Sequence, residues 1–219
     1  MKSKNVLISG ALVLAALVAF LVSYQNLPQQ VPIHWDSKGS VNGYGPRYAL
    51  LLLGPGLMLS EMLLFALLPR LSPKRFEVDS FKATYLHLML ILVSMTGYFF
   101  AIVLWASLTG SVDVISAILG GASAFTILLG NVMGKVRRNF FIGIRTPWTL
   151  ASERVWYATH RVAGKLLVIT GIIGLVLALL GTSAWLWLAV LGAGLSTLVA
   201  YSLYFYKSLE KRGKLDVSA

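Results

Sequence analysis

The side chains best placed to do chemistry are one carboxylate and three histidines that lie within or beside long apolar segments. Glu61 stands among apolar residues, and an ionised carboxylate inside a membrane costs a few kcal/mol unless it is paired or protonated. It could carry a proton, hold a basic partner, or lock two helices together, and the sequence leaves all three open. His87 falls at a similar predicted depth, so the two could meet. His34 adjoins Trp35, and this pair either forms part of a ligand cradle or anchors a loop at the membrane surface.

Metal binding and covalent catalysis find little support in these residues. Zinc needs three or four ligands, but the charge pattern below places His34 outside the cell and His160 inside, and no His-Glu-x-x-His pair is present. The chain has no cysteine, no Gly-x-Ser-x-Gly motif and no serine, histidine and acid grouped on one membrane face. We therefore expect a protein that is not an enzyme, with no catalytic residues, no metal site and no cofactor.

Composition places these side chains in a membrane protein. Of the 219 residues, 57% are hydrophobic and 12% are charged, which is too apolar for a soluble fold of this size. The net charge of +11 lies in short clusters between apolar runs and forms no continuous basic face. We therefore expect this charge to meet the lipid bilayer, with no direct contact to nucleic acid.

Six segments are long and apolar enough to cross a bilayer as helices, because about 20 residues span about 30 Å of hydrocarbon. They are residues 6–24, 48–68, 81–108, 112–133, 162–180 and 184–206. Of the 19 basic residues, 17 lie in alternate intervals that include both tails, and 2 lie in the others. By the positive-inside rule both termini are cytoplasmic. The sequence predicts an all-α polytopic membrane protein, N-in/C-in, with a long external first loop and a long basic cytoplasmic fourth loop.

The external loop, residues 25–47, is rich in turn formers. Pro32 favours an extended backbone before it, Asp36-Ser-Lys-Gly39 suits a type I turn, and Asn42-Gly43 offers another. These signals predict a short extended segment over residues 31–35, capped by turns. At the start of the fourth helix we expect Asp113 to cap the N-terminus.

The longest polar interval, residues 130–164, carries six basic residues and one acid, interleaved with aromatic rings. Such a segment suits the surface of an anionic membrane. Its sharpest element is Arg145-Thr146-Pro147-Trp148, because proline fixes a turn and disfavours helix before it. Arg145 could bind the loop backbone or an acidic group of a partner. The alternative is a rigid elbow anchored by Trp148 and Trp156.

A new helix is predicted directly after this turn. Thr149 or Ser152 can cap it, and the helix then runs straight into the fifth span. Trp156, His160 and Gly164 would stand in line on it at i, i+4 and i+8. Glycines at the end of the fourth span and along the fifth are predicted to let these two helices pack closely.

Two motifs resemble the SdpI family of bacterial membrane proteins. The first motif runs through Asn131-Val-Met133, Asn139-Phe-Phe-Ile-Gly-Ile-Arg-Thr-Pro-Trp-Thr-Leu150, Val155-Trp156 and Thr159-His160 with Gly164. The second, Pro32-x-His34-Trp35 followed by Gly39 and Gly43-Tyr44, resembles the uncharacterised domain that often precedes the first. The resemblance divides the chain into a two-helix domain, residues 1–80, and an SdpI-like four-helix domain, residues 81–219.

The resemblance implies a bacterial cell membrane protein that gives immunity to a secreted killing-factor peptide. It also implies, for the founding system, a sensor that holds a cytoplasmic transcriptional repressor at the membrane. The toxin-facing candidates are then His34, Trp35, Gly39 and Tyr44. The candidates for the cytoplasmic output are Asn131, Asn139, Gly143, Arg145, Thr146, Pro147, Trp148, Trp156, Thr159 and His160. The alternative function is a small-molecule or ion transporter, because the two halves have three helices each in opposite topology and Glu61 lies inside one of them.

Overall fold

The computed structural model describes residues 4–72, 78–110 and 113–215, and there it has six helical segments that are long and apolar enough to cross a membrane. Five are single helices, namely α1 (Lys4–Ser23), α4 (Lys82–Thr109), α5 (Val114–Met133), α7 (Glu153–Leu179) and α8 (Ala184–Lys211). The second in chain order joins α2 (Ala49–Leu51), the π-helical η1 (Leu52–Gly56) and α3 (Leu57–Leu71). The shorter elements are β1 (Gln30–Trp35), β2 (Val41–Pro46), the 3₁₀ helix η3 (Val78–Phe81) and α6 (Pro147–Ala151). The prediction of a mostly helical, multi-pass membrane protein is confirmed.

Most predicted boundaries agree with the helices within a few residues. The fifth span differs, because α7 begins at Glu153, nine residues before the predicted position 162. Asp113 caps α5 as predicted, since its Oδ1 accepts a hydrogen bond from the backbone N of Ser116 at 3.1 Å, which lowers the pKa of this carboxyl. The predicted start of the fourth span at residue 112 lies outside the described residues.

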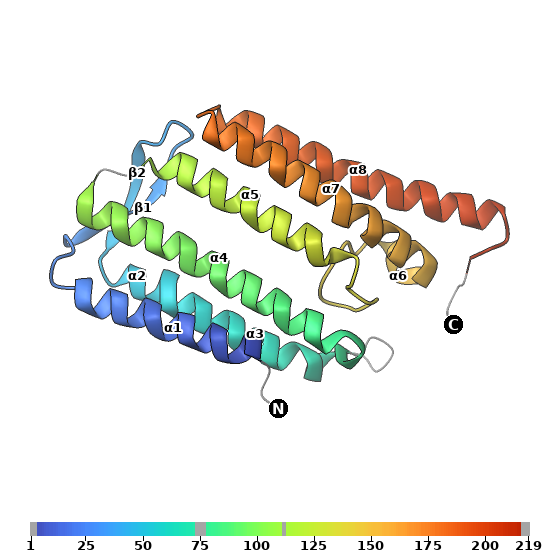
Figure 1. The fold of residues 1–219 in the computed structure, drawn as a ribbon, viewed down its shortest axis with the longest axis horizontal. Coiled ribbons are helices and arrows are strands. Elements are labelled where there is room, and N and C mark those ends of the chain that lie inside the picture. Colours follow the sequence, from blue (N-terminus) through green and yellow to red (C-terminus); the bar gives the residue numbers. More distant parts are fainter. Residues whose placement is uncertain (1–3, 73–77, 111–112, 216–219) are drawn as a thin grey trace.

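The helices run side by side in one elongated bundle (Figure 1). α4 packs against α1, α3 and α5, then α5 packs along α7, and α7 packs along α8. The strands β1 and β2 lie at one end of the bundle, whereas α6 and the loop before it lie at the other (Figure 1). The two long loops therefore lie at opposite ends of the molecule, as predicted.

Two prolines interrupt the second span, and each leaves one carbonyl without its helical donor. At Pro55 the helix widens into the π turn of η1, which re-forms the backbone bonds with a longer spacing. At Pro69 the free carbonyl is that of Phe65, and the hydroxyl of buried Tyr85 on α4 donates to it at 2.8 Å. This bond ties α3 to α4 in the half of the bundle away from the strands.

The close contact of α5 and α7 depends on glycine, as the sequence predicted. A Cβ at Gly130 would meet the carbonyl oxygen of Gly164 at 2.9 Å, and one at Gly171 would meet the carbonyl oxygen of Ser123 at 2.8 Å. No side chain fits at either point without moving the helices apart. The two backbones therefore touch directly and form the tightest seam in the bundle.

The external loop contains a two-stranded antiparallel sheet, which the all-α assignment left out. Residues 31–35 are extended as predicted, but they pair with β2. The turn between the strands holds Gly39 at φ +86°, and Asp36 Oδ1 accepts from the backbone N of Ser40 at 3.0 Å. Val31 is fully buried and Arg47 lies 4.3 Å from the ring centroid of Tyr24. These contacts hold the hairpin against the helix ends.

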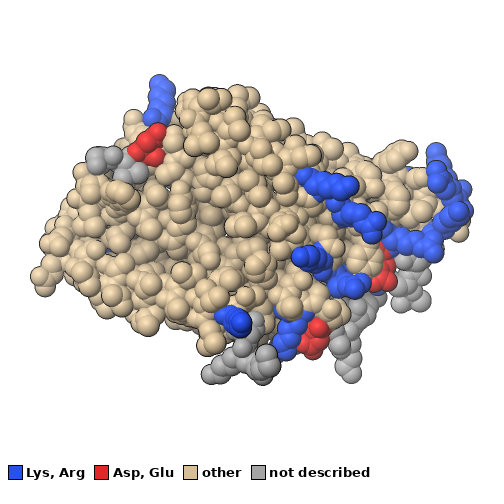
Figure 2. Space-filling model, viewed as in Figure 1, with Lys and Arg blue, Asp and Glu red and all other residues tan. Residues whose placement is uncertain are grey.

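Lysine and arginine side chains gather over the end of the bundle that carries α6 and the end of α8, and most of the remaining visible surface is uncharged (Figure 2). The exposed surface of the helices is apolar, with leucines of α1, α3 and α8 among the largest exposed residues. This distribution suits a bundle whose middle faces lipid. The orientation, with both termini in the cytoplasm, stays a prediction.

Candidate functional site

The loop that follows α5 is built around one buried amide. Asn139 is 1% exposed, and its Nδ2 donates to the carbonyl oxygens of Arg137 at 2.9 Å and Ile142 at 2.8 Å. Its Oδ1 accepts from the backbone N of Phe141 at 2.8 Å and of Ile142 at 2.7 Å. An asparagine side chain has two donors and two acceptor lone pairs, so its capacity is filled. This one side chain closes the loop on itself.

A stacked pair of aromatic rings on α7 packs against this loop. Buried His160 lies parallel to buried Trp156, with ring centroids 4.0 Å apart. His160 Nε2 accepts from the backbone N of Ile144 at 3.0 Å, and its Nδ1 bonds the carbonyl oxygen of Trp156 at 2.8 Å. A neutral imidazole with its proton on Nδ1 satisfies both partners. Gly143 stands over the pair at φ +118°, where an added Cβ would run into His160 Nε2.

The short helix α6 begins with a reciprocal cap. The hydroxyl of Thr146 accepts from the backbone N of Thr149 at 3.3 Å, and Thr149 Oγ1 accepts from the backbone N of Thr146 at 2.9 Å. Thr149 is fully buried and its hydroxyl also lies 2.8 Å from the carbonyl oxygen of Ile144. Pro147 then occupies the first helical position, where its missing N–H costs nothing. Thr146 therefore caps α6, a separate short helix that the sequence pattern did not distinguish from the helix after it.

Two further contacts fasten α6 to the bundle. Ser152 caps α7, because its hydroxyl accepts a hydrogen bond from the backbone N of Val155 at 3.3 Å. It is one of the two caps predicted from the sequence. Trp148 Nε1 donates to Ser202 Oγ on α8 at 2.5 Å. Residues 134–152, called the elbow below, are therefore attached to α7 through the Trp156 and His160 rings and to α8 through Trp148. The rigid-elbow alternative describes this geometry.

The hairpin at the opposite end carries the four toxin-facing candidates. His34 and Tyr44 are exposed, whereas Trp35 and Gly39 are half-buried. His34 Nδ1 lies 2.5 Å from Asn42 Oδ1 on the paired strand, and this contact holds the imidazole of the exposed histidine. The hairpin thus presents an oriented histidine and an exposed tyrosine on a small rigid surface.

Comparison with known proteins gives matches that cover both the hairpin and the elbow. The chain matches the SdpI/YfhL protein family over residues 135–202 and a domain of unknown function (DUF1648) over residues 11–59. It is 30% identical over 210 residues to the immunity protein SdpI of Bacillus subtilis (strain 168), a match that covers 94% of this chain and 98% of that protein. The chain belongs to the SdpI family. No solved structure matches it.

The SdpI match contains every contact of the elbow described above, because it begins at the first elbow residues and ends at Ser202. Ser202 itself was not found from the sequence, since a single serine inside an apolar helix gives no signal. The DUF1648 match contains the whole hairpin. The boundary between domains at residue 80 stays a prediction, since neither match reaches it.

The structure divides the ten output candidates of this SdpI member into two groups. Four of them, Asn139, Trp156, Thr159 and His160, are buried, and the other six are exposed or half-buried. These four buried side chains cannot touch a partner while the elbow is closed. A role of the ten residues in a cytoplasmic output stays a prediction. Arg145 is exposed, with its guanidinium 5.0 Å from the ring centroid of Phe140.

The other exposed output candidates, Gly143 among them, carry no charge. Pro147 is exposed at the start of α6, and Asn131 is exposed on α5, away from the elbow's bonds. Thr159 has a buried hydroxyl with no hydrogen-bond partner among the described residues. Arg145 is therefore the output candidate that combines charge with access to solvent.

Glu61 bonds to a different residue from the one proposed. Its Oε1 accepts from Thr96 Oγ1 on α4 at 2.6 Å, whereas its Oε2 is buried with no hydrogen-bond partner among the described residues. His87 is exposed and lies nine residues before Thr96 on α4, about 14 Å along the helix axis at 1.5 Å per residue. The expected meeting of Glu61 and His87 is therefore wrong. The structure shows the helix-locking arrangement, between α3 and α4.

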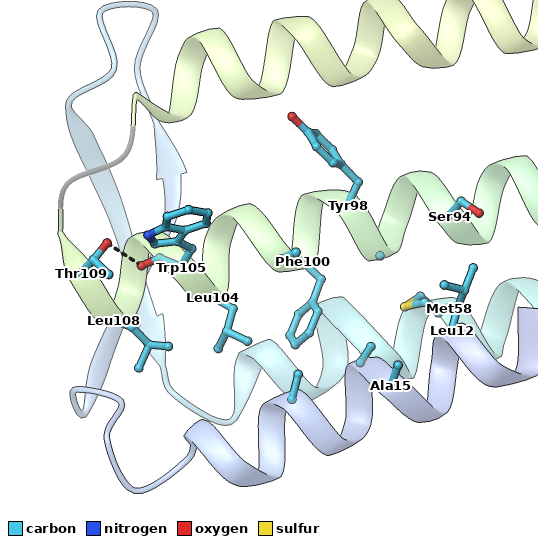
Figure 3. A pocket seen from close by; sticks show the side chains of 14 residues that line it. Leu12, Ala15, Met58, Ser94, Tyr98, Phe100, Leu104, Trp105, Leu108 and Thr109 are labelled. Atoms are coloured by element: carbon cyan, nitrogen blue, oxygen red, sulfur yellow. Dashed lines mark hydrogen bonds between the residues drawn. The ribbon is translucent and has the colours of Figure 1, made fainter.

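A groove of about 470 Å³ lies between α1 and α4 in the half of the bundle that carries the hairpin (Figure 3). Leu12 and Ala15 of α1 face Phe100 and Leu104 of α4 across it, and Trp105 lies toward its hairpin end. The lining is almost wholly apolar. In a membrane the acyl chains of lipids can fill such a groove, so its shape alone indicates no ligand.

Proposed function

We propose that this protein is an integral membrane immunity protein that protects its cell against a secreted antimicrobial peptide. The observation that carries the proposal is the 30% identity to the immunity protein SdpI of B. subtilis over nearly the full length of both chains. A match of this extent includes the hairpin, the bundle and the elbow together. The proposal therefore concerns the whole architecture and not one shared module.

The hairpin is the proposed toxin-facing surface. His34 and Tyr44 are exposed there, and the contact with Asn42 orients the imidazole before any ligand arrives. Rigid, partly apolar surfaces lose little conformational entropy on binding, which favours recognition of a peptide. Trp35 and Gly39 complete this surface as half-buried neighbours.

The elbow is the proposed output of a toxin sensor. A cytoplasmic repressor could be held at the membrane through the exposed Arg145 and the ring of Phe140, which is 42% exposed. Arginine on an aromatic face suits an acidic or planar group of a partner protein. The buried hydrogen bonds of Asn139 and His160 then hold this arginine in a fixed position.

Survival and signalling assays can separate these two parts. A bacterium sensitive to the family's killing-factor peptide would express the wild type, a His34→Ala/Tyr44→Ala variant, or Arg145→Ala, at equal membrane levels. We expect the hairpin variant to lose both protection and toxin-dependent membrane recruitment of a repressor. Arg145→Ala should lose recruitment and keep protection.

The matched control is Arg212→Ala, which removes an exposed arginine after α8 at the same end of the bundle. It should behave as the wild type in both assays. Full protection by the hairpin variant would contradict the toxin-facing assignment, and recruitment that survives Arg145→Ala would contradict the output assignment.

The transporter alternative gains no support from the packing of the helices. An inverted repeat would relate α1, α3 and α4 to α5, α7 and α8, so α1 and α3 should pack as closely as α5 and α7. In the structure α5 runs along α7 over its length, whereas α1 packs mainly on α4. The two halves therefore differ in architecture as well as in sequence.

A further inference from the structure

A second groove, of about 530 Å³, lies between α5 and α7 near the elbow end of the bundle. Its floor is open because glycines replace side chains there, at Gly130 of α5, at Gly134 directly after α5 and at Gly164 of α7. Lys165 and Arg161 line one side, and Val168 and Ile169 continue the wall toward the middle of the bundle. The amide of Asn131 faces the same groove from α5. The groove thus has a cationic mouth and an apolar extension.

The two cations of this groove are not used by the fold. Arg161 and Lys165 stand four residues apart on α7, so their side chains share one face of the helix. Both are exposed, and within residues 4–72, 78–110 and 113–215 neither forms an ion pair. Two neighbouring positive charges without an acid repel each other unless an anion is bound between them.

The position of the two cations along α7 indicates which kind of anion they can bind. Arg161 lies eight residues, or about 12 Å, into α7 from the elbow end. About 20 residues span the hydrocarbon of a bilayer, and 20 residues counted back from the end of α7 at Leu179 begin at residue 160, so Arg161 lies where headgroups give way to acyl chains. Beyond it, Val168 is half-buried and Ile169 is 54% exposed, and both can contact a hydrocarbon chain.

We propose that the groove between α5 and α7 binds one anionic phospholipid, with the phosphate between Arg161 and Lys165 and an acyl chain along Val168 and Ile169. The amide of Asn131 can donate to the same headgroup from the opposite side. This site is separate from the hairpin and shares only Gly134 with the elbow, and the inference does not depend on the immunity function.

The test is a titration of the purified full-length protein in a mild detergent, with bound lipid counted by native mass spectrometry. The probes are phosphatidylglycerol, phosphatidylcholine and soluble glycerol phosphate. We expect one phosphatidylglycerol to bind in preference to phosphatidylcholine, and glycerol phosphate to bind far more weakly. Removing both cations in Arg161→Gln/Lys165→Gln should weaken phosphatidylglycerol binding about thirtyfold, because each basic residue near a lipid surface contributes on the order of 1 kcal/mol.

The matched charge control is Lys207→Gln/Lys211→Gln, which removes two lysines with the same four-residue spacing from α8. It should retain the wild-type affinity for phosphatidylglycerol. An equal loss in both double variants would show attraction by net charge alone and would overturn the proposal. Binding of glycerol phosphate as tight as that of the lipid would overturn it too, since the groove would then be a phosphate site.

A steric variant tests the groove with its charges intact. An added Cβ at Gly134 meets nothing within 4 Å, so Gly134→Leu should fold normally and fill the mouth of the groove. Gly192→Leu on α8 has the same free space and lies outside the groove. We expect only the first variant to lose the bound lipid. Unchanged binding in Gly134→Leu would place the lipid elsewhere and refute the proposed site.

Discussion

Replacing Asn139 by Ala should open the elbow while the helical bundle stays folded. The amide makes four hydrogen bonds to the loop backbone from a position that is 1% exposed. A hydrogen bond contributes a net of about 1 kcal/mol, so losing all four costs about 4 kcal/mol before any penalty for buried groups left unpaired. At about 1.4 kcal/mol per factor of ten, the population of the open elbow should rise about a thousandfold.

Limited trypsin digestion in detergent measures this population. The reporter is the cut after Arg138, which is half-buried and donates to the carbonyl oxygen of Leu150 at 3.2 Å in the closed elbow. When the elbow closes faster than the protease cuts, the cleavage rate follows the open population. We expect Asn139→Ala to be cut at least about a hundred times faster than the wild type. This figure is lower than the roughly thousandfold rise in the open population because some cleavage of the wild type occurs in the closed form.

Two variants make the measurement decisive. Asn131→Ala removes an exposed amide from α5 and should leave the rate unchanged. Asn139→Asp keeps both accepting contacts and loses both donating ones, so its rate should fall between the wild type and Asn139→Ala. If Asn139→Ala is cut after Arg138 at the wild-type rate, the amide does not hold the elbow and the reasoning fails.

Three other substitutions test separate parts of the structure. Gly143→Ala should lower the midpoint temperature of thermal unfolding in detergent, because φ +118° and the imidazole of His160 exclude a Cβ. Gly134→Ala should leave it unchanged, because a Cβ there meets no atom within 4 Å. Tyr85→Phe should cost about 1–3 kcal/mol by leaving a proline-freed carbonyl unpaired, and Pro69→Ala should restore most of that loss in a denaturant titration. Glu61→Gln keeps an acceptor for the α4 hydroxyl, so it should protect as well as the wild type. Loss of a proton-linked flux in that variant would instead favour transport.

The helices were predictable because lipid imposes the strongest constraint on the sequence. A backbone that crosses hydrocarbon must satisfy its own hydrogen bonds, so each long apolar segment becomes a helix. The turn at Thr146-Pro147 was predictable for an equally local reason, since proline fixes a turn and disfavours helix at the residue before it. The alignment of Trp156 with His160 followed from helical periodicity alone and is confirmed by their stacking.

The burial of the elbow residues could not be predicted in the same way. A stretch of arginines, threonines and aromatic rings has the composition of a membrane surface or a binding face. Whether Asn139 faces solvent or the loop interior depends on backbone dihedrals that composition does not determine. The φ of +118° at Gly143 is the feature that brings the chain over His160, and a glycine in a loop permits many other paths.

Depth within the membrane was the weakest quantity inferred from the sequence. Glu61 and His87 were placed at one level by counting from the predicted ends of two spans. An error of a few residues at each end adds up, and a π turn in the second span shifts its register further. The bond between Glu61 and Thr96 places Glu61 level with Thr96, which lies about 14 Å along α4 from His87.

The helix that connects the proposed sensor and output surfaces is α5. At one end, its Ile115 side chain lies against the hairpin turn, where a Cβ on Gly39 would be 3.4 Å away. At the other end α5 leads directly into the elbow, and between the two it touches α7 backbone to backbone. Closely packed helices shift as rigid bodies, because their interfaces do not deform continuously. If the proposed toxin contact displaces the hairpin, the displacement can reach the elbow through α5 together with α7, without any change in the lock around Asn139.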